Sequence, residues 1–450
     1  MDLKKSVIQL FLSRAAKSIL GFLAVIVFSQ EMGASPLGTY YPFLAILGIL
    51  SIPADLGIRG AVEKRISEGQ NQGAYLGTAL ALTIPIVLSI CLLIYSFQEY
   101  VNQYLGEKLA LLLILGLVVN QMGSLSLAVL RAELRVGETA ILEFLRPLCW
   151  LVIGYALYLY GYRAIALVYG YLFGSIVVML LGWWKISIKV GYPRVEQAIS
   201  LKNYAKFGVI SKIGGAIFSW TDIFVLTSFV VVQGTVTRSE VGAYENAWRL
   251  SLIAVMLSRT ISTAIFPQFS QWDAEGVRNK IENMIPKVAL PALLMVLPCF
   301  IGTVVLSRDL LRILFGPEFT VAWLALIVLS AGTVVQSLHG IIAQPLQAID
   351  RPDLSAYASA VSIVINIILN IILVWRWGIL GAAIATAISF AINTVLHTLY
   401  LRRFIQIQLP LQEAAWSIMA SVTMGICIQI TSSIIGVSDM YELLAIVILG

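Results

Sequence analysis

The chain has 450 residues, of which 59% are hydrophobic and only 12% are charged. Soluble domains carry about 25% charged residues, so this composition excludes an ordinary soluble protein and indicates a polytopic membrane protein. The net charge of +6 does not indicate nucleic-acid binding, because the charges lie in short connections between apolar runs. Four cysteines lie inside apolar runs without the spacing of metal ligands, so we expect neither disulfides nor a metal site: Cys91, Cys149, Cys299 and Cys427.

Long apolar segments predict thirteen membrane-spanning helices and one shorter run, since about 20 apolar residues cross a bilayer. Six segments are expected first, at 7–30, 39–56, 74–97, 109–130, 141–160 and 164–184. Seven more are expected at 205–232, 242–270, 284–307, 320–348, 355–375, 379–401 and 412–434. A last run begins near Tyr441, so we expect the sequence to end inside a fourteenth helix.

The first apolar segment carries two cations, Arg14 and Lys17, well inside its length. Residues three apart share one face of a helix, so both cations point the same way. A cation in hydrocarbon costs about 2.5 kcal/mol or more, so we expect this face to line a water-filled cavity or to meet an anionic partner. Three alternatives are a signal peptide, an interfacial helix that snorkels its charges into water, and an internal ion pair.

Lysine and arginine are distributed unevenly over the connections between these segments. Connections on the side of the N-terminus carry eighteen of them, whereas those on the opposite side carry six. Cytoplasmic loops carry an excess of Lys and Arg. We therefore expect a cytoplasmic N-terminus in a multi-pass protein of the cytoplasmic (inner) membrane.

A basic linker at 185–206 divides the chain into two halves that share a G-x-Y motif, at Gly38–Tyr40 and at Gly242–Tyr244. An even number of helices separates the motifs, so the two halves have the same orientation. Parallel repeats imply a pseudo-two-fold axis along the membrane normal and a substrate site between two lobes that alternate access. The predicted domains are a six-helix lobe at 1–190, a six-helix lobe at 191–405, and additional C-terminal helices at 406–450.

Charged residues also lie in the apolar segments of the second half. Glu245, Arg249 and Arg259 are spaced to stack on one side of a continuous helix, where Glu245 neutralises Arg249 and leaves Arg259 without a local partner. Asp222 on the preceding segment could complete a network. One interpretation is a purely structural set of ion pairs. In the other, the cations face those of the first segment across the interface between the lobes.

Two further charged pairs lie at the ends of predicted helices. Asp55 and Arg59, four residues apart, are expected to form an interfacial ion pair, although Asp55 could instead titrate as a gate. Glu143 and Arg146, three residues apart, are expected to form a structural pair.

Neutral polar residues occur in the later segments. Asn366 and Asn370 share a helical face and are expected to hydrogen-bond between helices, with sugar contacts as the alternative. His339 is expected to make a hydrogen-bonded helix contact, with a proton carrier as the alternative, and His397 lies near the cytoplasmic end of its segment.

Several motifs, in their order along the chain, resemble the polysaccharide exporter family, the oligosaccharide flippases. They are LGTYYPFLAILGILSIPADLGIRGAVEKRISE, WTDIFVLTSFV before EVGAYENAWRL, IFPQFSQ, LFGPEF, and VINIILNIILVWRWGILGAAIATAIS at Val364–Ser389. Within this resemblance, a G-x-Y helix ends in a D-x-G turn that precedes a basic loop. The similarity covers essentially the whole chain and leans toward O-antigen and exopolysaccharide flippases.

The resemblance implies an all-α protein of two lobes around a central cavity, which moves a polyprenyl-diphosphate-linked oligosaccharide across the membrane. Cations and amides would bind this substrate: Arg14, Lys17, Arg249, Arg259, Asn366 and Asn370. Carboxylates would couple transport to H+ or Na+: Asp222, Glu245 and Asp55. Expected partners are membrane lipids and a polysaccharide polymerase or glycosyltransferase, with no nucleic acid.

Two other functions stay open, an ion-coupled drug exporter of the same superfamily and a non-transporting scaffold in a glycan-assembly complex. A drug exporter would favour an acidic cavity, and a scaffold would have fully paired charges. The sequence has no G-x-x-x-x-G-K-[ST] loop, no catalytic nucleophile constellation and no cofactor motif, so we expect transport and not enzymatic chemistry.

Overall fold

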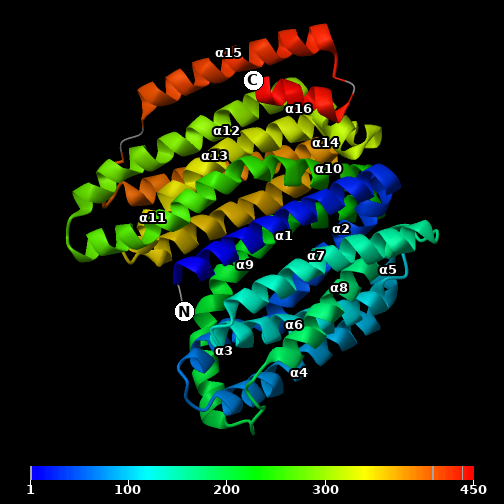
Figure 1. Cartoon of the computed structure of the whole chain (residues 1–450), viewed down its shortest axis with the longest axis vertical. Helices are drawn as coiled ribbons and strands as arrows, with labels where there is room; N and C mark the ends of the chain where they lie inside the picture. Colours follow the sequence, from blue (N-terminus) through cyan, green and yellow to red (C-terminus); the bar gives the residue numbers. More distant parts are fainter. Residues whose placement is uncertain (1–2, 408–409, 438, 450) are drawn as a thin grey trace. The chain divides into compact units, whose positions relative to one another are not determined.

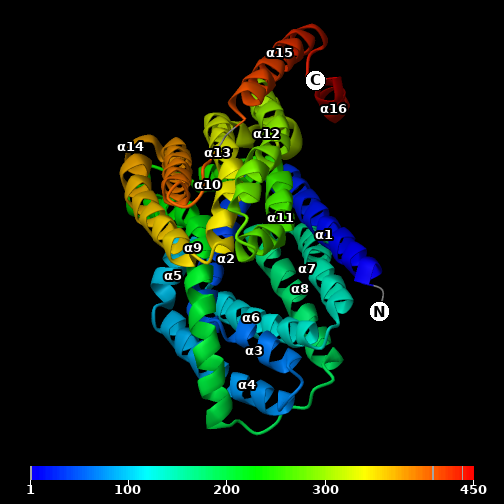
Figure 2. The same ribbon diagram turned by 90° about the vertical axis from the view of Figure 1, so that its left-hand side faces the viewer.

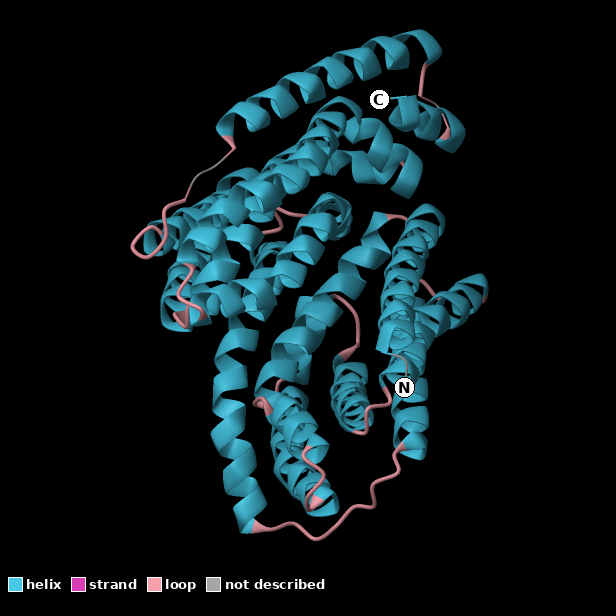
Figure 3. Ribbon diagram, turned by 60° about the vertical axis from the view of Figure 1, so that its left-hand side comes forward, coloured by secondary structure: helices cyan, strands magenta, loops and turns pink. Residues whose placement is uncertain are grey.

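The computed structural model describes residues 3–407, 410–437 and 439–449, and the side chains of these residues outside 3–15, 207–217, 257, 411, 435 and 447–449. The described residues form helices joined by loops, with no strand among them (Figure 3). Nine helices of the described part are long and apolar enough to cross a membrane. The predicted all-α polytopic membrane fold is confirmed.

The chain divides into two compact units, Met1–Val231 and Val232–Gly450 (Figure 1). The first unit contains α1 (Leu3–Met32), α2 (Ala34–Asp55), α3 (Ile58–Ser67), α4 (Gln72–Ser96), α5 (Gln98–Leu105), α6 (Ala110–Ala132), α7 (Val136–Leu159), α8 (Ala164–Lys185) and α9 (Val195–Val232), which ends at the boundary. The second contains α10 (Arg238–Ser251), η1 (Leu252–Val255), α11 (Met256–Ala274), α12 (Arg278–Phe315), η2 (Pro317–Ala322), α13 (Trp323–Ala348), α14 (Pro352–Leu401), α15 (Leu411–Ile435) and α16 (Met440–Leu449).

Each predicted apolar segment other than 242–270 corresponds to a helix or to one arm of a helix, and the segments at 355–375 and 379–401 are the two arms of α14. Gly378 separates these arms with non-helical backbone angles, φ 55° and ψ −132°. The predicted continuous helix at 242–270 is wrong, because the 3-10 turn η1 interrupts it. Two short helices, α3 and α5, were not predicted, since their segments are too polar and short to span a membrane.

Aromatic side chains fasten α1, α2 and α7 together in the first unit. The ring of Trp150 stacks on Tyr40 with centroids 5.2 Å apart and lies 4.9 Å from the ring of Phe28. The indole nitrogen of Trp150 donates to the carbonyl of Leu167 on α8 over 3.1 Å, so this buried polar group is satisfied. The G-x-Y tyrosine of the first half is therefore a packing residue.

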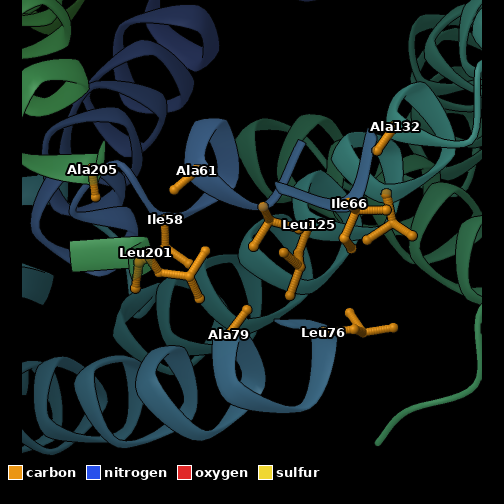
Figure 4. Close-up of a cluster of buried hydrophobic side chains, with 11 residues drawn as sticks. Ile58, Ala61, Ile66, Leu76, Ala79, Leu125, Ala132, Leu201 and Ala205 are labelled. Carbon is orange, nitrogen blue, oxygen red and sulfur yellow. The ribbon is translucent and has the colours of Figure 1, made fainter. Parts of the chain in front are cut away.

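The helix α9 packs against other helices of the first unit through an apolar cluster (Figure 4). In this cluster, Leu201 and Ala205 of α9 join buried residues of α3, α4 and α6, including Ile58, Leu76 and Leu125. The hydroxyl of Tyr104 on α5 also donates to the carbonyl of Phe224 on α9 over 3.0 Å. The boundary between the compact units therefore lies at the end of α9, between Val231 and Val232. The predicted division into two lobes at residue 190 stays a prediction.

The long loop between α8 and α9, residues 186–194, is held on the first unit (Figure 3). The amide of Gly191 donates to the carbonyl of Gly73 over 2.8 Å, and the amide of Arg194 donates to the hydroxyl of Thr78 over 3.0 Å. A Cβ added at Gly77 would lie only 1.9 Å from the Gly191 carbonyl oxygen. Only glycine permits so close an approach of the loop to α4.

In the second unit, α14 folds back on itself at Gly378 and forms a helical hairpin (Figure 2). A Cβ at Gly381 would lie 2.1 Å from the carbonyl oxygen of Leu373, so the backbones of the two arms are in contact next to the bend. The hairpin packs on α13, which in turn packs on α12. The C-terminal helices α15 and α16 pack on α12 and on each other.

Candidate functional site

A polar cavity of about 540 Å³ lies between α1, α3, α6 and α7 of the first unit. Its charged lining consists of four cations and two carboxylates: Lys17, Arg59, Arg131, Arg146, Glu63 and Glu143. The remaining lining residues are Gly60, Ser124 and Leu127. Among the lining residues cations exceed carboxylates by two, and by one when Asp55, the buried partner of Arg59, is counted, so the cavity attracts an anionic group.

A sharp turn between α2 and α3 positions Arg59 at this cavity. Leu56 and Gly57 have left-handed backbone angles, with φ 42° and 77°, which ends α2 at Asp55 and starts α3. One carboxylate oxygen of buried Asp55 accepts from the backbone amide of Arg59 over 3.0 Å and lies 2.8 Å from its guanidinium Nε. The predicted ion pair between Asp55 and Arg59 is confirmed, and Asp55 also satisfies one of the free backbone amides in the first turn of α3.

The other cavity charges form an alternating chain that joins four helices. Glu143 of α7 lies 2.9 Å from Lys17 of α1 and 3.7 Å from Arg131 of α6. Arg131 donates through its Nε to Glu63 of α3 over 3.0 Å. Each of these side chains is at least 31% exposed, so the chain of charges lies along the wall of the cavity and not in its apolar surroundings.

Arg146 is a cavity cation that takes no part in these ion pairs. It forms no ion pair within 4.0 Å with a described residue, and its buried Nε has no hydrogen-bond partner among them. The predicted structural pair of Arg146 with Glu143 is therefore wrong, because Glu143 is bound by Lys17 and Arg131. A guanidinium carries five donors in a planar fork, so Arg146 brings unused donors to the cavity wall.

Of the predicted substrate-binding cations, Lys17 lines the cavity, whereas the side chain of Arg14 lies outside the described residues. In the second unit, Arg249 pairs with buried Glu245 over 2.8 Å, which confirms that prediction. Arg259 is exposed on α11. The predicted stripe from Glu245 to Arg259 on one helix is wrong, since η1 changes the helical phase between them.

The remaining predicted site residues are buried. Asp222 lies on α9 of the first unit. Asn366 donates to the hydroxyl of Thr386 on the opposite arm of α14 over 3.4 Å, and Asn370 donates to the carbonyl of Asn366 over 3.1 Å. The predicted hydrogen bond between helices is confirmed for Asn366. The structure thus brings Lys17 and the Asp55–Arg59 pair to the cavity, but not these amides.

Among the charged lining residues, sequence reasoning assigned a site role to Lys17 alone and missed the other five: Arg59, Arg131, Arg146, Glu63 and Glu143. Arg131 counted only as a loop charge, although it lies in the last turn of α6. One signal was available: Glu63 follows Arg59 by four residues, which places both on one face of α3.

Loop charges outside the membrane-spanning segments hold the start of α7. Arg135 donates to Glu138 over 2.6 Å and to Glu133 over 3.2 Å. These bonds, led by the one to Glu138, raise the pKa of Arg135 above its usual value.

Among the described residues, no group of three or more His, Cys, Asp or Glu side chains could hold a metal ion.

Comparison with known proteins identifies relatives along the whole chain. A probable low-salt glycan biosynthesis flippase of Haloferax volcanii is 41% identical over 443 residues, which cover 98% of this chain and 93% of that protein. A second probable flippase of the same organism is 29% identical over 92% of this chain and 87% of its own length. A putative O-antigen transporter of Shigella flexneri is 23% identical over 84% of this chain and 91% of its own length.

Solved structures share the fold. The lipid II flippase MurJ in its inward closed conformation aligns with a TM-score of 0.81 at 18% identity, over 98% of this chain and 96% of that one. An inward-facing multidrug resistance transporter of the MATE family aligns with a TM-score of 0.66 at 16% identity, over 86% of this chain and 94% of that one. The family model described as polysaccharide biosynthesis protein matches residues 32–324. With this match and a relative 41% identical along nearly its whole length, the chain belongs to the family of polysaccharide biosynthesis proteins.

Proposed function

We propose that this protein is a flippase that moves a polyprenyl-diphosphate-linked oligosaccharide across the cytoplasmic membrane during assembly of a cell-surface polysaccharide. The observation that carries this proposal is the 41% identity, over nearly both whole lengths, to a probable glycan biosynthesis flippase. The cationic cavity of the first unit supports it independently, because the charged part of such a substrate is its diphosphate.

A diphosphate cannot cross hydrocarbon without partners that replace its lost hydration. The cavity offers four such cations, and Arg146 among them has donors that no described side chain uses. A guanidinium grips phosphate through two parallel hydrogen bonds, which a lysine ammonium cannot do. We therefore assign first contact with the diphosphate to Arg146, with Lys17, Arg59 and Arg131 completing the site.

The transport cycle that we propose is alternating access, in which the sugars pass through a polar path while the polyprenyl tail stays in lipid. Arg14, Arg249 and Arg259 would hold the diphosphate at other stages, and Asn366 and Asn370 would contact sugars. Release requires the cations to be neutralised or rehydrated. A proton or sodium ion exchanged at Asp55, Asp222 or Glu245 would change this balance of charge.

The distribution of Lys and Arg over the loops supports a cytoplasmic N-terminus. The cavity would then lie on the cytoplasmic side, since Arg59 and Arg131 adjoin loops of that side. A lipid-linked oligosaccharide made in the cytoplasm would meet the cavity first, directly after the glycosyltransferases that build it. A polymerase would receive the product on the other side.

A drug exporter is the second candidate, because MATE transporters share the fold. Such an exporter of cationic compounds would favour an acidic cavity, whereas the lining of this cavity has an excess of two cations. Its charge therefore favours the flippase.

The experiment is a flipping assay with the purified full-length protein in lipid vesicles. The probe is a polyprenyl diphosphate that carries a fluorescent disaccharide, and the control probe is the same disaccharide on polyprenol without phosphate. We expect the protein to accelerate transbilayer movement of the first probe and not of the second. Export of ethidium with no movement of either probe would show a drug exporter, and movement of none of the three would show a scaffold.

A further inference from the structure

The chain contains two histidines, and the structure brings both together inside the second unit. His339 of α13 and His397 of the second arm of α14 are 58 residues apart in sequence. Their rings lie edge to face, with centroids 4.6 Å apart and an angle of 88° between the planes. Histidine changes charge near neutral pH, so this contact places the two side chains best suited to hold a proton side by side.

The hydrogen bonds of His397 determine which of its nitrogens carries a proton. Its Nδ1 lies 2.9 Å from the carbonyl oxygen of Asn393, which can only accept, so Nδ1 is the donor. Its Nε2 lies 3.0 Å from the hydroxyl of Ser355 on the first arm of α14. In the neutral ring, Nε2 accepts from that hydroxyl. If Nε2 takes up a proton, it can donate to the same hydroxyl oxygen, because a hydroxyl both donates and accepts.

His339 differs from His397 in its hydrogen bonds and in its exposure. Its Nδ1 is buried and has no hydrogen-bond partner among the described residues, while part of the residue is exposed. The free Nδ1 of His339 can take up a proton once water reaches it, and His397, which is 1% exposed, can keep that proton without losing a hydrogen bond. Two cationic rings in contact repel each other, so the pair holds one proton and not two.

The surroundings of the pair leave the two rings as the titrating groups. On α11, Ser258 and Ser262 lie beside Gly340, the neighbour of His339. On α12, the residues packed against this part of α13 are apolar: Val288, Ala289 and Ala292. At the start of α14, Arg351 and Asp353 bind each other over 2.9 Å. On α10, Glu245 pairs with Arg249.

We propose that His339 and His397 form a binding site for one proton within the second unit, and that this proton couples the transport cycle to a proton gradient. The coupling rests on the function proposed above, whereas the proton site itself does not. The pair joins α13 to both arms of α14, so a charge placed there acts on three helical segments at once. A buried charge without a carboxylate partner is costly, so the packed arrangement favours the neutral pair. A conformation that admits water to His339 favours the protonated pair, and this difference is what couples a proton to a conformational change.

The proton site is tested by nuclear magnetic resonance of the full-length protein with histidine-selective 13C and 15N labelling. Every labelled signal belongs to the pair, because the chain has no third histidine. We expect both rings of the wild-type protein to shift with one common midpoint. In the wild type, the two rings together should show the change of one protonated ring, whereas the single ring left in His339→Asn or in His397→Asn should show the full change by itself, as for coupled groups. Two fully protonated rings in the wild type, or rings that never titrate, would overturn the site.

Ser355→Ala keeps both histidines and guards against variants that merely fail to fold. It removes the hydroxyl that accepts from protonated His397, so the common midpoint should move to lower pH. An unmoved midpoint would contradict the assigned role of His397 Nε2. Size-exclusion profiles and helical content of all three variants are compared with those of the wild type.

The coupling is tested by movement of the fluorescent polyprenyl-diphosphate disaccharide across vesicles with an imposed pH gradient. The wild-type rate should change by up to about tenfold per pH unit on one side of the midpoint, as for one titrating site. The double variant His339→Asn/His397→Asn has no ring left to protonate and should respond less than about twofold. A wild-type response retained in this double variant would overturn the coupling. No movement by the wild type at any pH would overturn the proposed function, while a shared midpoint would still support the proton site.

Discussion

The two units differ in how they treat polar groups between their helices. In the first unit, six charged side chains line a cavity of about 540 Å³, and their ion pairs are partly exposed. In the hairpin of the second unit, the buried polar side chains are neutral, and Asn366 and His397 bond to a hydroxyl and to a backbone carbonyl. Charge is costly in a dry interior, whereas neutral groups can be satisfied there. The cavity thus holds fixed charges in ion pairs, whereas the hairpin holds neutral polar groups that bond its arms together.

The largest effect is expected where the hairpin depends on backbone contact. Gly381→Val places a side chain onto the carbonyl of Leu373, which a Cβ would approach to 2.1 Å. Because the obstacle is backbone, we expect a loss of about 3 kcal/mol or more in stability, at the upper end of overpacking effects. Thermal unfolding in detergent measures it. The matched control is Gly60→Ala in the cavity wall, where a Cβ meets nothing within 4 Å. Equal unfolding temperatures in both variants would contradict the contrast between the units.

The next effect concerns the unused donors of Arg146. Arg146→Ala should weaken binding of the polyprenyl-diphosphate probe by about ten- to a hundredfold, since hydrogen bonds to charged groups contribute about 1.5–3 kcal/mol. Arg146→Lys keeps the charge but loses the planar fork, so its loss should be smaller. Binding is measured by fluorescence with folded protein. The control is Arg278→Ala, which removes an exposed arginine at the start of α12 that pairs with Asp273. Wild-type affinity in Arg146→Ala would remove Arg146 from the site.

A smaller effect of opposite sign is expected from Glu143→Gln. This change removes the carboxylate that Lys17 and Arg131 share, and it raises the excess of cations among the lining residues from two to three. The probe should bind about three- to tenfold more tightly and leave more slowly, with the difference shrinking at high salt. Stability should fall by about 1 kcal/mol or less, because the pairs are partly exposed. Glu68→Gln, an exposed loop change outside the cavity lining, is the control. Weaker binding in Glu143→Gln alone would indicate that Glu143 positions the cations.

The difference between the units also explains what the sequence could predict. Helices followed from apolar length, and the pairs Asp55–Arg59 and Glu245–Arg249 followed from a spacing of four residues. The bond between Lys17 and Glu143 spans 126 residues, and its geometry exists only after α1 and α7 pack. Local spacing suggested Arg146 as the partner of Glu143 and was overridden by this packing. The contact of His339 with His397 was likewise beyond reach, because it depends on the fold of α14 at Gly378.

The smallest effect should come from the neutral polar contact inside the hairpin. Asn366→Ala removes the donor to the Thr386 hydroxyl, a long bond of 3.4 Å, so the expected loss in stability is about 1 kcal/mol. Thr386→Val removes the acceptor and should cost a similar amount. The double variant should cost less than the two single losses combined, because one bond is counted twice in the singles. The proposed sugar contact needs the amide of Asn366 and not the hydroxyl of Thr386, so probe movement should slow in Asn366→Ala and stay at the wild-type rate in Thr386→Val. Equal rates in these two variants would remove the sugar contact and leave Asn366 with the bond between the two arms alone.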